Sequence, residues 1–132
     1  MALVEKEIAQ TDINSWLDYK RIDESKREDQ KDAIKVLVNA VSEGTLIMNE
    51  DKTFTQKLKF PPEGETPMLE LIYKPRLKVA TIHLHLNGVK SSDADGRLMA
   101  HVCALTGKPK AAIQALDTED YSIASSIAVF FL

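Results

Sequence analysis

The chain has 132 residues, with 17 basic and 20 acidic side chains and a formal net charge of −3. A chain of this length fits one domain with one hydrophobic core, so we expect residues 1–132 to form a single domain. The near balance of charge holds on both sides of residue 60 and gives no support for nucleic-acid binding, because such affinity depends on clustered Lys and Arg.

The sequence predicts a protein of a reducing compartment that does not enter a membrane. Cys103 is the only cysteine, which excludes an internal disulfide. The amino terminus turns acidic at Glu5 and lacks the basic start and apolar core of a signal peptide. The uncharged run at residues 121–132 is shorter than the ~20 residues that a membrane-spanning helix needs.

The first part of the chain predicts two helices. Thr11 or Asp12 is expected to cap the first helix, whose inner face holds Ile13, Trp16 and Leu17. A second helix is expected to begin at the capping box of Ser25 and Glu28 and to end at Gly44. The apolar residues of its inner face recur with helical spacing and are Ile34, Leu37, Val38 and Val41.

Beyond Gly44 the apolar residues alternate with a period of two, which indicates strands. We expect a β-hairpin over residues 45–60 with its turn at residues 49–52. Its return strand is expected to place Phe54, Leu58 and Phe60 on one face. Three prolines at residues 61–67 predict a loop, after which residues 68–73 predict a third strand.

The remaining residues predict further helices. Val, Thr, Ile and Leu in residues 77–86 favour a strand, whereas Pro75 and the following Asn87-Gly88 favour a helix, which is our prediction. The other helix signals are a Ser92 cap, Gly107 as a terminator, Pro109 in a first turn, and Asp117 or Thr118 as the last cap. The expected fold class is α+β: mainly helical, with a small antiparallel hairpin or three-stranded sheet and a C-terminal helical bundle.

No pattern in the sequence indicates an active site or a metal site. His83 and His85 would share one face of a strand but lie ~200° apart on a helix, and no companion ligand accompanies them. Residues 93–96 begin like a calcium loop but lack its later glycine and glutamate. Cys103 lies on a largely apolar segment, and the basic residues at 74–78 are too few for a nucleic-acid site. We therefore expect no catalysis, no cofactor and no metal.

The last third of the chain resembles a known family. It carries Ala104-Leu105-Thr106-Gly107-Lys108-Pro109, then Leu116-Asp117-Thr118-Glu119-Asp120-Tyr121, and it ends in Phe131-Leu132, with a weaker echo at Tyr73-Lys74-Pro75. These motifs resemble the C-terminal pattern of phage tail assembly chaperones of the Mu-like type. The resemblance implies a non-enzymatic protein of the host cytoplasm that binds the tape measure protein, helps to recruit tail tube subunits, and leaves before the tail is finished.

The uncharged C-terminal segment is the strongest sequence candidate for a protein-binding surface. The expected contact residues are Tyr121, Ile123, Ile127, Phe130, Phe131 and Leu132, beside a small-residue side formed by Ser122, Ser125, Ser126 and Val129. This surface would bind a tape measure helix or a second copy, so that truncation after Val129 would weaken binding and leave the hairpin folded. Packing of both sides inside the domain is the alternative.

Two other function classes compete with the chaperone. A structural tail component, such as a tube, baseplate or completion protein retained in the virion, is favoured by the predicted hairpin, since the sheets of tube subunits join edge to edge. A small nucleic-acid binder is a third class, with little support from the charge pattern.

Overall fold

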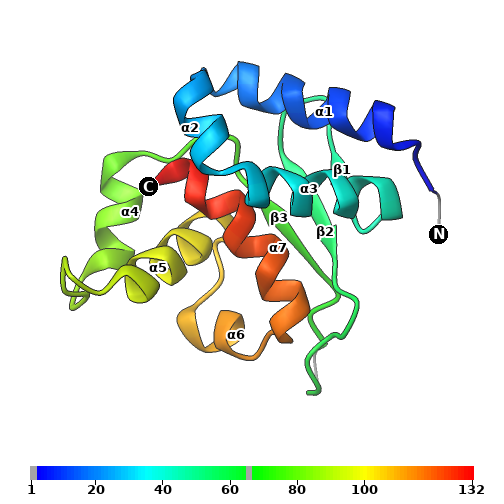
Figure 1. Ribbon diagram of the computed structural model, residues 1–132. Coiled ribbons are helices and arrows are strands. Elements are labelled where there is room, and N and C mark those ends of the chain that lie inside the picture. The colour runs from blue at the N-terminus through cyan, green and yellow to red at the C-terminus, as the bar shows by residue number, and fades with distance from the viewer. Residues whose placement is uncertain (1–2, 65–66) are drawn as a thin grey trace.

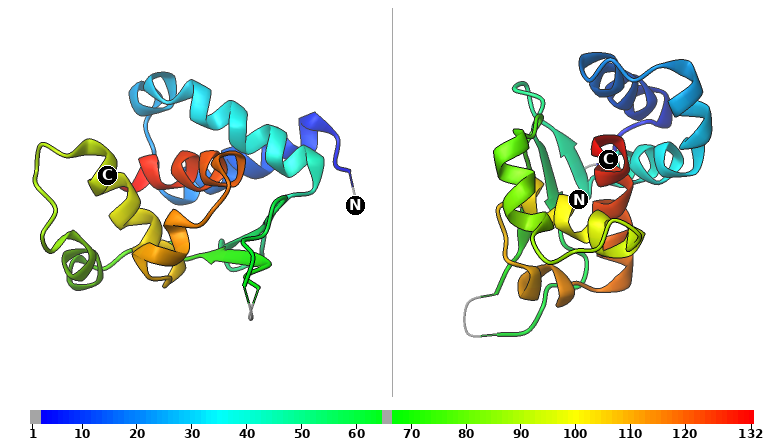
Figure 2. Two further views of the ribbon diagram at one scale, coloured as in Figure 1. Left: turned by 90° about the horizontal axis from the view of Figure 1, so that it is seen from below. Right: turned by 90° about the vertical axis from the view of Figure 1, so that its left-hand side faces the viewer.

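Helices α1, α3 and α7 lie on one side of a three-stranded antiparallel sheet in the computed structural model, which describes residues 3–64 and 67–132 (Figures 1 and 2). The predicted α+β fold class is confirmed. In chain order the elements are α1 (Lys6–Tyr19), α2 (Glu24–Asp29), α3 (Lys31–Glu43), β1 (Leu46–Met48), β2 (Phe54–Lys57), β3 (Glu70–Tyr73), α4 (Val79–Leu86), α5 (Ala94–Thr106), α6 (Lys110–Gln114), α7 (Thr118–Ala128) and the 3₁₀ turn η1 (Val129–Phe131).

The hairpin and the third strand form where the sequence predicts them. β1 pairs with β2, which sets Ile47 opposite Thr55, and β3 pairs with the other edge of β2, which sets Ile72 opposite the same residue. The strand order is therefore β1-β2-β3. The predicted loop has no helix or strand at residues 61–64 and 67, and its residues 65 and 66 lie outside the described part of the chain.

The end of the return strand differs from the prediction. β2 stops at Lys57, and Phe60 lies beyond the sheet with 53% of its surface exposed instead of facing the core. The backbone N–H groups of Lys59 and Phe60 donate to the Asp120 carboxylate, at 2.9 and 3.0 Å, and so turn away from the ladder.

The first helix has the predicted inner face but begins earlier than predicted. α1 starts at Lys6, and Thr11 lies inside it with its hydroxyl donating to the Glu7 carbonyl at 2.9 Å, so neither Thr11 nor Asp12 is the cap. The buried residues of α1 are Ala9, Ile13, Trp16 and Leu17.

The predicted second helix is two helices. The Asp23 carboxylate caps α2 by accepting from the Lys26 N–H at 2.8 Å, so the predicted capping box of Ser25 and Glu28 is wrong. Gln30 interrupts the helix with φ −110° and ψ 27°, and α3 follows. α3 ends at Gly44, as predicted; the φ of 80° there is a conformation that glycine adopts without steric cost. Its buried face is Leu37, Val38, Ala40 and Val41, with Ile34 partly buried beside them.

The C-terminal half is helical, as predicted. Residues 79–86 form α4, which confirms the helix over the strand alternative. The cap of α5 is Asp93, which accepts from the Gly96 N–H at 2.9 Å, and not Ser92. Pro109 occupies the cap position of α6, just before its first turn, and Asp117 caps α7 by accepting from the Glu119 N–H at 2.9 Å.

One hydrophobic cluster joins the N-terminal helices, the inner sheet face and α7. The Trp16 ring lies 5.0 Å from the Phe54 ring and 5.8 Å, edge-on, from the Phe130 ring, so three parts of the chain meet at one indole. The cluster also encloses polar groups: the Tyr73 hydroxyl donates to Gln56, whose amide donates to the Asp120 carbonyl at 2.9 Å. Burial raises the pKa of Tyr73, which remains a donor in this network.

Candidate protein-interaction surface

The structure buries most of the predicted C-terminal binding surface. Ile123, Ile127 and Phe130 are 5%, 0% and 5% exposed and belong to the core. α7 packs against α3 and against α5, so both of its long sides are covered (Figure 1). These three residues are therefore not available to a partner in this fold, and the predicted surface has to be corrected.

The other predicted contact residues retain little free surface. Tyr121 is half-buried, and Leu132 is 54% exposed at the end of the chain. The Phe131 ring contacts Trp16, at 6.1 Å between centroids, and the Lys20 ammonium, at 3.4 Å from its centroid. Burial and then the nearby Arg76 charge lower the pKa of Lys20 to about 8, whereas the ring face favours the charged ammonium.

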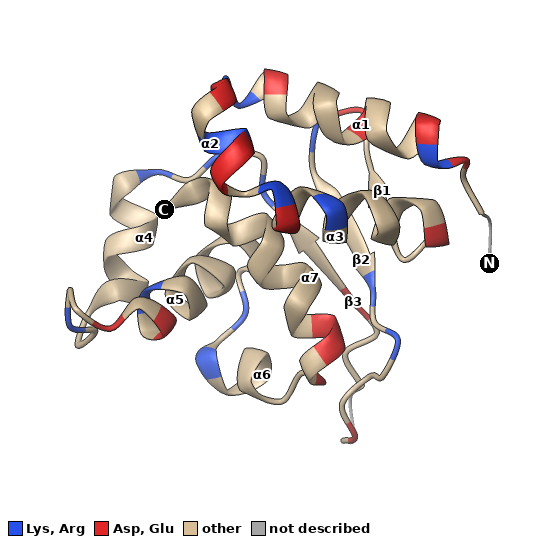
Figure 3. Cartoon of the chain, viewed as in Figure 1, with Lys and Arg blue, Asp and Glu red and all other residues tan. Residues whose placement is uncertain are grey.

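Helix α4 lies in the opposite environment. Its sequence, VATIHLHL, contains no charged residue, yet none of its eight residues, all described by the structure, is buried. Val79 and Leu84 are 70% and 78% exposed. Figure 3 shows α4 free of charged residues at one end of the molecule. It packs mainly against α5. Apolar surface that neighbouring elements leave uncovered can contact a partner, which makes α4 a candidate interaction site.

The exposed residues of α4 form one stripe, which we call the α4 surface: Val79, Ala80, His83 and Leu84. These positions are i, i+1, i+4 and i+5, which share one side of a helix. The opposite side holds His85, which lines a small cavity of about 50 Å³ with Met99 and Cys103 of α5. α4 is thus held on one side and open on the other.

Basic side chains precede the α4 surface along the chain. Lys74, Arg76 and Lys78 are exposed in the segment between β3 and α4. This segment is not part of the sheet, because β3 ends at Tyr73. The Arg76 guanidinium lies 5.1 Å from the centre of the Tyr19 ring. The arrangement fits a partner helix that carries acidic residues beside an apolar stripe.

The sequence contained a signal for this surface. No charged residue occurs between Lys78 and Lys90, a run in which a solvated helix would carry several. The sequence alone does not show that these residues are exposed, and the uncharged run at residues 121–132 is longer.

The side chains that could bind a metal or react with a substrate do not lie together in one site. In residues 3–64 and 67–132 no group of three or more His, Cys, Asp or Glu side chains could hold a metal ion. His101 is buried, with its Nδ1 2.7 Å from the Arg97 carbonyl. Cys103 is buried as well, and burial raises the pKa of its thiol, which disfavours the reactive thiolate. Over the same described ranges no helix has the length and apolar content required to cross a bilayer.

The motifs that resemble the phage family have structural roles in this fold. Gly107 ends α5 with φ 70°, and the Thr106 hydroxyl donates to the Val102 carbonyl at 2.8 Å. Asp117 caps α7, and Asp120, which is fully buried, joins α7 to the end of the hairpin. These residues fix the C-terminal helices and do not line a site.

No family model, curated protein or solved structure matches this chain. The functional interpretation therefore rests on the C-terminal motifs and on the physical character of the surface.

Proposed function

We propose that this protein is a phage tail assembly chaperone of the host cytoplasm whose α4 surface binds an apolar face of the helical tape measure protein and which helps to recruit tail tube subunits. The observation that carries the proposal is the uncharged, outward-facing stripe of α4. Such a stripe can cover an amphipathic helix that would otherwise aggregate. Catalysis and cofactors have no part in this activity.

The energetics suit a partner that is later released. Full burial of Val79 and Leu84 would stabilise the complex by about 1.5 to 3 kcal/mol each, before the cost of association and side-chain ordering. A surface with two large apolar residues therefore supports modest, reversible affinity. A chaperone that leaves before the tail is complete requires affinity of this kind.

The C-terminal motifs provide independent support. The residues that resemble the family end α5, cap α7 and join α7 to the hairpin, so they help to fix α5, against which α4 packs. A resemblance at such positions favours a common C-terminal fold. It supports the α4 surface indirectly, through the placement of α5.

Co-expression with a phage tape measure protein tests the proposal. We expect the wild-type chain to keep that protein soluble and to copurify with it, and Leu84→Asp to lower the recovered partner at least about tenfold, since a charge would be buried in an apolar contact. Leu69→Asp is the matched control, because Leu69 is 62% exposed and lies outside α4. Equal recovery with Leu84→Asp and wild type would contradict the proposal.

The alternative is a structural tail component retained in the virion. Within the described residues no strand pairs with the outer edges of β1 and β3, which favours this function, because such edges can pair with other subunits. Mass spectrometry of purified particles separates the two functions: a chaperone is absent from finished particles, whereas a tube, baseplate or completion protein is present in fixed stoichiometry.

A further inference from the structure

A hollow of about 300 Å³ lies between helices α1 and α3, which pack side by side (Figure 1). This volume is at the lower end of the range for small-molecule sites, ~300 to 1,000 Å³. The hollow shares no residue with the α4 surface. We call it the α1–α3 hollow, and it is lined by Lys6 and Gln10 of α1 and by Lys31, Ile34, Lys35, Val38 and Asn39 of α3.

Every charged residue that lines the α1–α3 hollow is a lysine. Lys6 and Lys35 have no ion-pair partner within residues 3–64 and 67–132. The Lys31 ammonium lies 3.5 Å from the Glu28 carboxylate, but these side chains are 70% and 75% exposed, and an ion pair so exposed to water is weak. A hollow lined by charges of one sign concentrates ligands of the opposite sign. The lining therefore favours an anion.

The spacing of the lysines is unfavourable unless an anion binds. Lys31 and Lys35 occupy positions i and i+4 of α3, so their like charges lie on one side of the helix and repel each other. Lys6 adds a third positive charge from the first turn of α1. Glu7 and Asp32, which follow Lys6 and Lys31 in the sequence, do not line the hollow. A bound anion would offset the repulsion between the lysines.

The uncharged lining residues suit a small organic molecule. The Gln10 side-chain amide donates to the Asn14 side-chain carbonyl at 3.0 Å, which leaves the Gln10 oxygen able to accept from a hydroxyl group. Asn39 contributes a second amide, and the partly buried Ile34 offers apolar contact to a carbon skeleton. Val38 is only 8% exposed. The apolar area is therefore too small to hold a partner helix but large enough for a small ligand.

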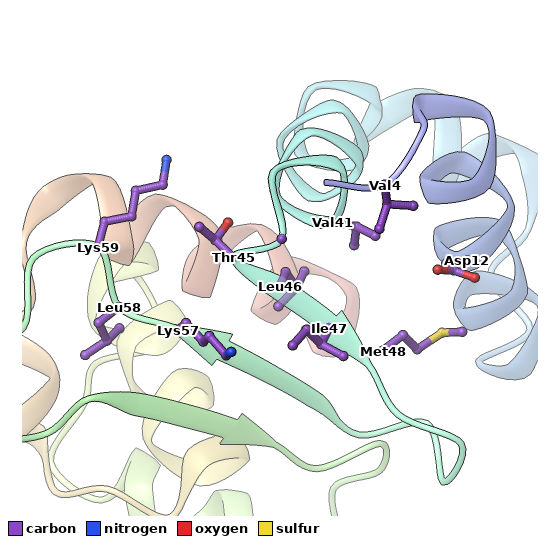
Figure 4. A pocket seen from close by; sticks show the side chains of 11 residues that line it. Val4, Asp12, Val41, Thr45, Leu46, Ile47, Met48, Lys57, Leu58 and Lys59 are labelled. Carbon is purple, nitrogen blue, oxygen red and sulfur yellow. The ribbon is translucent and has the colours of Figure 1, made fainter. Parts of the chain in front are cut away.

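The hollow beside β1 provides a contrast (Figure 4). Its charged lining residues carry both signs, since Asp12 is acidic and Lys57 and Lys59 are basic. Lys59 is already paired, with its ammonium 3.1 Å from the Glu43 carboxylate. The other lining residues of that hollow are mostly apolar. Of these two hollows, only the one between α1 and α3 has a lining that selects for negative charge.

We propose that the α1–α3 hollow binds a small phosphate ester. A phosphate monoester carries a charge of about −1.5 to −2 at neutral pH and three acceptor oxygens, so it can contact several ammonium groups at once. The lysines hold the phosphate group, the amides of Gln10 and Asn39 bond the hydroxyl groups, and Ile34 contacts the carbon skeleton. The proposal goes beyond the chaperone function and does not depend on the α4 surface.

Titration of the full-length, ¹⁵N-labelled protein followed by NMR tests the proposal. The probes are glucose 6-phosphate, glycerol 3-phosphate and AMP. We expect saturable shifts of backbone amides in residues 6–10 and 31–39, with a Kd of about 0.1 to 1 mM for the tightest ester. Glucose, which lacks the phosphate group, should bind at least about tenfold more weakly than glucose 6-phosphate, because it has no charge for the lysines to attract.

Substitutions in the lining separate the roles of charge and of the amides. Lys35→Met should raise the Kd of the tightest ester at least about fivefold, whereas Lys35→Arg, which keeps the charge, should stay within about threefold. Lys57→Met is the matched control in the hollow beside β1, with an expected change below about twofold. Asn39→Ala should weaken binding of the ester and leave that of inorganic phosphate unchanged. Circular dichroism verifies the fold of each variant.

Several results would overturn the proposal. These are the absence of saturable shifts with all three esters at up to about 10 mM, equal affinity of Lys35→Met and wild type, or an equal loss with Lys57→Met. Inorganic phosphate that binds as tightly as every ester would leave only a general anion site. Tighter binding of a short polyglutamate peptide than of any ester would instead assign the hollow to an acidic protein partner.

Discussion

Helices α7 and α4 differ sharply in burial although both are rich in apolar residues. Ile127 of α7 is fully buried, whereas Leu84 of α4 is 78% exposed. α7 has α3 on one side and α5 on another, while α4 has α5 as its main neighbour. The position of a helix among its neighbours, more than its hydrophobicity, therefore decides whether its apolar side chains are buried or exposed.

The difference in burial between α7 and α4 also implies different roles, in stability for α7 and in binding for α4. A buried apolar side chain stabilises the fold by leaving water, and an exposed one can stabilise only a complex. Substitutions in α7 should therefore change the free energy of unfolding, and substitutions in α4 should change partner affinity.

Truncation at the C-terminus should have the largest effect. Removing residues 130–132 deletes Phe130, whose ring packs edge-on against Trp16, so we expect a loss of at least about 3 to 5 kcal/mol in the free energy of unfolding. This outcome differs from the sequence-based expectation, in which truncation after Val129 weakened partner binding and left the hairpin folded. Removing Leu132 alone is the control, expected to cost less than about 1 kcal/mol in urea unfolding. Truncated protein as stable as wild type would show that η1 is not core.

A matched pair of alanine substitutions compares the two helices directly. Ile127→Ala should destabilise the protein by about 2 to 5 kcal/mol, because it leaves a cavity beside α3 and α5. Leu84→Ala should change the free energy of unfolding by no more than about 0.5 kcal/mol. Urea titration followed by circular dichroism measures both. Similar losses for the two variants would mean that α4 is as much part of the core as α7.

Asp120 should account for a further part of the stability of α7. Its buried carboxylate accepts from the N–H groups of Lys59 and Phe60, so Asp120→Ala leaves these donors unpaired and should cost about 1 to 3 kcal/mol. Asp95→Ala provides a control at an exposed position in the first turn of α5, where the expected change is below about 0.5 kcal/mol. A loss no greater than that of the control would show that α7 is held by apolar packing alone.

Lys20 should give the smallest effect, and one that depends on pH. Its pKa is about 8 in the folded chain and 10.5 ordinarily, so the unfolded chain binds more protons between these values. Raising the pH through that window therefore favours the folded state. We expect the stability of wild type relative to Lys20→Met to rise between pH 8 and pH 10, measured as the difference in melting temperature. A difference that falls over this range would indicate that the ring of Phe131 dominates over burial.

The sequence predicted the local structure well. Gly44 and Gly107 end helices because the left-handed conformation at these positions favours glycine, and the hairpin follows from its period of two. Helix starts were less predictable. Thr11, Ser25 and Ser92 can all cap a helix, but the neighbouring chain decides which polar residue does so, as the Thr11 hydroxyl shows by bonding inside α1.

Long-range contacts limited the prediction of the site. The hydrogen bond from the Lys59 N–H to the Asp120 carboxylate joins residues 61 positions apart, and no local sequence pattern predicts it. The same holds for the burial of Ile123 and Ile127, which depends on α3 and α5 meeting α7 from different sides. The uncharged run of residues 79–89 was visible in the sequence, but its exposure follows only from the place of α4 in the fold.

Amide hydrogen exchange on the complex decides whether α4, and not α7, contacts the tape measure protein, as we propose. We predict that binding slows exchange across residues 79–86 at least about tenfold and leaves residues 118–128 unchanged, because the core amides are already protected. Unchanged exchange in α4, together with new protection at the C-terminal residues, would contradict the account and return the binding surface to the end of the chain.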